Sequence, residues 1–242
     1  MHCDLTAFGL PETLRTGREI RRVCGDAQSL EEAAQRICKA LYAGLHDGPG
    51  SSLACVLIRC YKTHPFGELP SELQAFVRSA APEPDELREH TKCLVLLGTA
   101  GSEPDWNSRL TSRQHQAIAL SSVGGIQQAP MIARLFSDFG VELQKLVNPA
   151  DHQMQTVRAK TYGVFYVENA NGSPAIPAQE FVRRHHVTSV IGCGGELPRD
   201  EMFASILFSR VSVDRTTAER FRTLALDMKA SFFRFGTSET FS

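Results

Sequence analysis

The stretch TSVIGCGGELPRDEMFASILFSRV, residues 188–211, decides how this chain folds. It opens on an apolar run, and three glycines then surround Cys193. This pattern is found in the phosphate-binding turn of a nucleotide site, in a tight loop that presents a reactive thiol, and in the bend of a β-hairpin.

The residues around the glycines argue against a nucleotide site. A phosphate-binding turn leads from a strand into a helix, because the helix N-terminus supplies amide donors to the phosphate. Here ELPRDEM leads into FASILFSRV, which has the composition of a second strand, and no Lys-Ser or Lys-Thr pair follows the glycines. We therefore predict a hairpin in which Gly194 and Gly195 supply a bulge or a close backbone approach.

Cys193 is the one catalytic candidate. A nucleophilic thiol needs a nearby histidine or a helix N-terminus to lower its pKa, and His185 and His186 lie a few residues upstream. The competing interpretation is a cysteine that fills space beside a partner strand, and we favour it.

The composition is that of a globular protein with a real core. The 242 residues are 42% hydrophobic and 22% charged, with a net charge of −1, so nothing indicates a nucleic-acid partner or an anionic membrane surface. We expect one domain over residues 1–242 with an enlarged middle insertion at about 102–187.

The seven cysteines are scattered, without a CxxC pair, which favours a reduced protein. Cys55 and Cys60 are expected on opposite faces of one strand, because side chains alternate along a strand. The sequence has no signal-peptide pattern, no membrane-spanning run and no HExxH or similar motif, so we expect a cytoplasmic protein without a metal.

The apolar periodicity predicts an α+β fold. The best-specified helix covers 29–45, with Ser29 as N-cap and Glu32 at the capping-box position. The last helix begins at Thr216 or Thr217, one of which is expected to cap it. Further helices are expected at 71–80, at 127–143 and from near Ala178, and strands at 53–61, 93–101, 117–120 and 162–170.

This element order, with the phrases CYKTHPFGELP, DWNSR, GSPAIPAQEF and SVIGCGGELP…MFASILFSRV, resembles a bacterial GAF-like sensory segment of the kind found ahead of histidine-kinase or other output domains. The resemblance implies a central antiparallel sheet of five to six strands. The N- and C-terminal helices would pack on one face of this sheet, and a ligand pocket would lie on the other, roofed by 106–116 and 165–180. The sequence carries no bilin-attachment motif, no NKFDE signature and no three-cysteine sulfoxide-reductase pattern.

Four candidate binding residues lie in or after the DWNSR loop: Trp106, Asn107, Arg109 and His115. Trp106 offers a flat apolar wall, and Arg109 offers a fork for a carboxylate or phosphate. The alternatives are that Trp106 anchors the loop, that Arg109 makes a salt bridge, and that His115 is a hydrogen-bonded structural residue.

The implied roof supplies four more candidates: Phe165, Ile176, Gln179 and Glu180. Pro174 and Pro177 stiffen this segment, and its alternative role is a rigid connection between strand and helix.

The leading hypothesis is therefore a non-catalytic domain that binds a small molecule and signals to a partner or output domain through its terminal helices, which also favour a homodimer. The alternatives are a thiol-dependent redox enzyme that uses Cys193 and an interaction module without a ligand. The sequence names no cofactor and no ligand.

Overall fold

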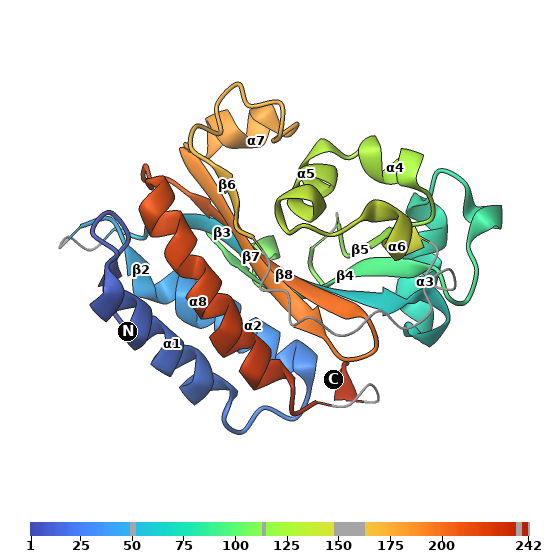
Figure 1. The fold of residues 1–242 in the computed structure, drawn as a ribbon, viewed down its shortest axis with the longest axis horizontal. Helices are drawn as coiled ribbons and strands as arrows, with labels where there is room; N and C mark the ends of the chain where they lie inside the picture. Colours follow the sequence, from blue (N-terminus) through green and yellow to red (C-terminus); the bar gives the residue numbers. More distant parts are fainter. Residues whose placement is uncertain (49–51, 113–114, 148–162, 236–238, 242) are drawn as a thin grey trace.

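A six-stranded antiparallel sheet in the order β5-β4-β3-β8-β7-β6 forms the centre of the molecule (Figure 1). The computed structural model describes residues 1–48, 52–112, 115–147, 163–235 and 239–241. The strands of the sheet are β3 (Cys55–Pro65), β4 (Lys92–Gly101), β5 (Ala117–Ala119), β6 (Phe165–Val167), β7 (Ser189–Leu197) and β8 (Glu201–Ser209). The short strands β1 (Cys3–Asp4) and β2 (Leu45–His46) pair in parallel beside it.

Strands β7 and β8 form the predicted hairpin. Their register runs unbroken from the Ser189–Ser209 pair to the Leu197–Glu201 pair, and the connecting turn places Arg199 and Asp200 at positive φ. The glycines provide a close approach and no bulge, since a Cβ on Gly194 would lie 2.3 Å from the carbonyl oxygen of the opposite strand. The nucleotide-loop interpretation has no place in this geometry.

The terminal helices cover one face of the sheet (Figure 1). Helices α2 (Leu30–Gly44) and α8 (Arg215–Phe232) contact the strands, and α1 (Leu10–Cys24) packs outside them. The Ser29 cap of α2 is confirmed, because its hydroxyl accepts a hydrogen bond from the Glu32 amide at 3.0 Å. The predicted threonine cap of α8 is wrong. Asp214 caps this helix by accepting from the Thr217 amide at 2.6 Å.

Short helices lie over the other face (Figure 1). They are α4 (Val123–Gln127), α5 (Pro130–Asp138), α6 (Leu143–Val147) and α7 (Gln179–Arg184), and α3 (Ser71–Ala80) packs near the edge strand β5. The single helix expected at 127–143 is thus divided, and Gly140 at φ 72° separates α5 from α6. Each face of the sheet has its own apolar core.

Strand β3 carries two register shifts, one near Cys55 and one between Cys60 and Tyr61. Because the first of these shifts lies between Cys55 and Cys60, both cysteines belong to the core on the terminal-helix face, and the prediction that they point to opposite faces is wrong. A bulge adds one residue to the alternation, so a count of five residues no longer reverses the direction.

The predicted GAF-like α+β architecture is confirmed by this arrangement of sheet and helices. Among the described residues, no helix is both long and apolar enough to cross a membrane. The same part of the chain contains no cluster of three or more side chains suited to holding a metal ion.

Candidate functional site

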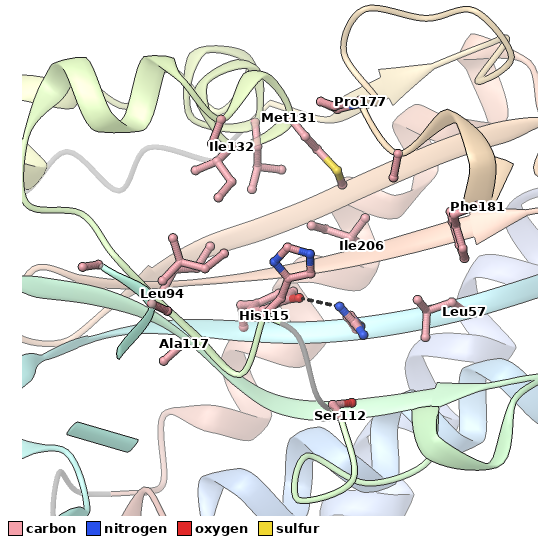
Figure 2. A pocket seen from close by; sticks show the side chains of 18 of the residues that line it. Leu57, Leu94, Ser112, His115, Ala117, Met131, Ile132, Pro177, Phe181 and Ile206 are labelled. Carbon is pink, nitrogen blue, oxygen red and sulfur yellow. Dashed lines mark hydrogen bonds between the residues drawn. The ribbon is translucent and has the colours of Figure 1, made fainter. Parts of the chain in front are cut away.

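A cavity of about 740 Å³ lies between the sheet and the short helices of the second face (Figure 2). Its floor is formed by β3, β4, β5 and β8, and its walls by α3, α5, the 105–112 segment, His115 and the 176–181 segment. This volume is in the range of sites for drug-sized small molecules.

Alternation along β3 places Leu57, Arg59 and Tyr61 on the cavity floor. One Nη atom of Arg59 donates a hydrogen bond to the Tyr61 hydroxyl at 3.3 Å. No described carboxylate forms an ion pair with Arg59, and its buried Nε has no hydrogen-bond partner. A cation inside an apolar cavity therefore retains unused donors.

The segment before β5 contributes Ser112 and His115 to the wall. The Ser112 hydroxyl is buried without a hydrogen-bond partner, and His115 is held at φ 61°, a conformation that few non-glycine residues adopt. Burial, together with the positive charge of Arg59, lowers the pKa of His115, so its imidazole is neutral at pH 7. A neutral imidazole both donates and accepts hydrogen bonds.

The rest of the cavity is mainly apolar. Figure 2 shows Met131 and Ile132 of α5 pointing into the same space as His115 and Ile206 of β8. Phe181 of α7 closes one end, and its ring lies 5.7 Å from that of Trp106 in an edge contact. The site therefore combines a large apolar surface with a few polar groups, which is typical of small-molecule pockets.

Three of the predicted binding residues line this cavity: Trp106, His115 and Ile176. Two residues of the DWNSR loop do not. The Asn107 amide bonds the amide and carbonyl of Gly101, both at 3.1 Å, and so fixes the loop to the end of β4. Arg109 pairs with Glu31 of α2 through bonds of 2.8 and 3.1 Å, which is the salt-bridge alternative.

The other three predicted residues also lie outside the cavity lining. Phe165 is fully buried in the core below. The Gln179 side chain bonds the backbone of its own loop, including the Ala170 carbonyl, to which its amide donates at 3.0 Å, and this is the rigid connection that the alternative proposed. Glu180 is exposed in the first turn of α7.

Cys193 lies on the opposite face of the sheet from the cavity, in the core beneath the terminal helices. It is fully buried, and burial raises the pKa of its thiol to about 12. His185 stacks on Trp106 at 4.9 Å between ring centroids, on the cavity side. The sheet therefore separates the thiol from His185, and the geometry does not favour Cys193 as a nucleophile.

Sequence reasoning missed several lining residues, above all Arg59 and Ser112 from the polar set and Met131, Ile132, Leu135, Phe181 and Ile206 from the apolar set. The signal for Arg59 was present in LIRCY, where a charged residue interrupts an apolar strand. The contribution of α5 depends on tertiary packing and leaves no local signature.

No protein-family model matches the chain, and no curated protein matches its sequence. Matching solved structures include the GAF domain of a phosphoenolpyruvate-protein phosphotransferase from Acinetobacter, at 13% identity and TM-score 0.40, with 90% of this chain and 91% of that chain covered. A phycocyanobilin-bound GAF domain from a cyanobacterial phytochrome matches at 11% identity and TM-score 0.45, with 92% and 94% covered.

An N-acylhomoserine-lactone-dependent LuxR-family transcription factor from Burkholderia cenocepacia matches at 12% identity and TM-score 0.45, with 93% and 96% covered. At these values none of the three identifies a ligand or an activity for this chain. The central antiparallel sheet, the terminal helices on one face and the roofed cavity on the other are the arrangement that the sequence resemblance implies. By its own architecture, the chain has a GAF-like α+β fold.

Proposed function

We propose that this protein is a sensory domain that binds a small molecule in the cavity over β3 and β8. The observation that carries the proposal is the combination of a cavity of about 740 Å³ with polar groups on its wall that lack partners, namely Arg59 Nε and Ser112 Oγ. Buried polar groups in folded proteins are nearly always hydrogen-bonded, so unpaired groups on residues that line a cavity favour a ligand that pairs them.

The signal would pass from the cavity to the terminal helices through the sheet. The side chains of β3 alternate, so Arg59 faces the cavity while its neighbours Ile58 and Cys60 pack under the terminal helices. A ligand changes the arrangement of these helices only if it binds one arrangement better than another. We propose that the readout is a homodimer or an output partner that contacts α1 and α8.

Native mass spectrometry of the purified protein, together with an absorption spectrum, tests ligand binding. We expect a co-purifying small molecule that is lost in a Met131→Trp variant, because Met131 points into the cavity and an indole would fill it (Figure 2). Ser137→Trp is the matched control, since Ser137 is exposed on the same helix and does not line the cavity.

A ligand that binds only the folded protein also raises the midpoint of thermal unfolding. We expect Ser137→Trp to keep this rise and Met131→Trp to lose it. A ligand-free mass, together with no stabilisation by any compound of a metabolite library, would contradict the proposal and favour an interaction module.

A further inference from the structure

The chemistry of the cavity specifies a class of ligand. Arg59 lies in the middle of β3, paired with Ile206 on one side and Thr99 on the other, so strand pairing on both sides fixes its backbone. Its guanidinium uses one Nη atom on the Tyr61 hydroxyl at 3.3 Å. Its Nε and its second Nη atom have no hydrogen-bond partner among the described residues.

The free Nε and Nη2 atoms form one planar edge of the guanidinium. Two parallel N–H donors on such an edge match the two oxygens of a carboxylate. Arginine remains charged at all physiological pH values. An anion is therefore the partner that both neutralises this charge and accepts hydrogen bonds from the unpaired donors. The guanidinium of Arg59 is therefore suited to a carboxylate.

The charges around the cavity favour a ligand with a single negative charge. Arg59 is the one arginine or lysine among the described residues that line it, and Asp105 is the one acidic residue. Asp105 is exposed in a surface turn, whereas Arg59 lies on the cavity floor. A nucleotide or a polyphosphate carries more charge than one guanidinium compensates.

The remaining lining determines the body of the ligand. Met131, Ile132 and Leu135 on α5 face Ile206 and Phe208 on β8 across the cavity. Such a surface desolvates a ring or a hydrocarbon chain favourably. Ser112 and the neutral imidazole of His115 add hydrogen-bonding groups and no fixed charge.

We propose that the cavity binds an organic monocarboxylate with an apolar ring or chain as its body, and that its carboxylate pairs with the guanidinium of Arg59. This inference rests on the proposed ligand-binding function. It adds the chemical class of the ligand and names Arg59 as the residue that selects it.

The test uses the full chain and three matched pairs of probes: naphthaleneacetate with naphthaleneacetamide, phenylbutyrate with phenylbutyramide, and decanoate with decanamide. Each pair keeps the apolar body and replaces the charge by a neutral amide of nearly the same shape. We expect the best carboxylate to bind about ten- to a hundredfold more tightly than its amide, measured by isothermal titration calorimetry.

Arg59→Met keeps the length of the side chain and removes its charge. We expect this variant to bind the carboxylate as weakly as the amide, while its affinity for the amide is unchanged. Arg59→Lys keeps the charge without the planar fork, so we expect a reduced but measurable preference for the carboxylate. Arg59→Lys also tests the role of Arg59 if the Arg59→Met variant does not fold.

Three outcomes separate the hypotheses. Equal affinity for carboxylate and amide in the parent protein, with both lost in Met131→Trp, would overturn the monocarboxylate inference and leave the ligand-binding function supported. A carboxylate preference that persists in Arg59→Met would overturn the role of Arg59. Failure of all six probes to bind the parent protein would contradict the inference, and a co-purifying ligand in native mass spectrometry would still support the function.

Discussion

Arg59 and Arg109 show how far a single side chain can be interpreted from the sequence. Arg109, in an obviously polar loop, was the expected anion ligand, yet it pairs with Glu31 on the other side of the sheet. Arg59, in an apolar strand, received no prediction and lies on the cavity floor. The informative feature is the environment, because a charge in an apolar strand is costly unless something compensates it.

Gly98 provides a test of packing at one residue. A Cβ at this position on β4 would lie 2.5 Å from the carbonyl carbon and oxygen of Ala34, which belong to the backbone of α2. Because helix backbone cannot move aside as a side chain can, we expect Gly98→Ala to lower the free energy of unfolding by about 1–3 kcal/mol in urea titrations.

Gly124→Ala is the control, since a Cβ on Gly124 of helix α4 meets nothing within 4 Å. We expect that variant to be neutral or slightly stabilised, because alanine favours the helix. Equal stability of the two variants would show that α2 does not approach β4 as closely as the structure indicates.

Helix α1 was not predicted from the sequence, and its burial pattern explains why. Its buried positions include Thr13, Thr16 and Gly17, while Leu10 and Leu14 are exposed. Apolar periodicity identifies a helix only when its buried face is apolar, as it is in α2. Local signals for α1 existed in the proline at its start and in the Glu12 carboxylate that bonds the Gly9 amide at 3.0 Å.

Strands β3 and β8 share a buried ion pair. Lys62 Nζ lies 2.5 Å from Glu201 Oε2, with side chains 3% and 8% exposed. Removing one partner leaves a buried charge uncompensated, so we expect Glu201→Gln to lower the free energy of unfolding by about 3–5 kcal/mol at pH 7. The double variant Lys62→Met/Glu201→Leu removes both charges and should recover most of this loss. If the free energies of unfolding lost in the two single variants simply add up in the double variant, the pairing would be contradicted.

The same carboxylate predicts a pH dependence. Burial alone would raise the pKa of Glu201, but the His64 imidazole, whose Nδ1 lies 3.4 Å from Glu201 Oε1, and the charge of Lys62 lower it below 4.5. A folded-state pKa below the unfolded one means that the ionised group stabilises the fold above about pH 4.5, and that this stabilisation disappears as the pH falls through the folded-state value. Stability should therefore fall more steeply with acid in the parent protein than in Glu201→Gln.

The overall architecture was predictable because it depends on element type and order. The hairpin, the α2 cap and the apolar strands are encoded locally, and together they indicated the α+β class. The cavity lining was not predictable in the same way. It is assembled from β3, β8, α5, the 105–112 segment and His115, and most of these elements are far apart in the sequence. Only three of the eight expected binding residues therefore line the cavity, and Arg59 was not among the eight.

The outer surface of the terminal helices predicts self-association. Among the described residues, six large apolar side chains are exposed, and four of them lie on α1 or at the end of α8: Leu10, Leu14, Leu226 and Phe233. These helices pack side by side, so the exposed side chains belong to one layer of the molecule (Figure 1). Exposed apolar residues on two neighbouring helices are typical of an interaction surface, and we expect a homodimer through α1 and α8.

The double variant Leu14→Glu/Leu226→Glu places a charge on each helix at exposed positions, so it should leave the fold intact and convert the dimer to a monomer in light scattering after gel filtration. Leu110→Glu is the matched control, because Leu110 is 70% exposed and lies outside both helices. It should remain dimeric.

Because the sheet separates this surface from the cavity, probe binding should persist in the monomer, with an affinity that changes only if dimerisation and ligand binding are coupled. A parent protein that is monomeric at the same concentration would contradict the dimer, and equal dissociation by all three leucine substitutions would place the interface elsewhere.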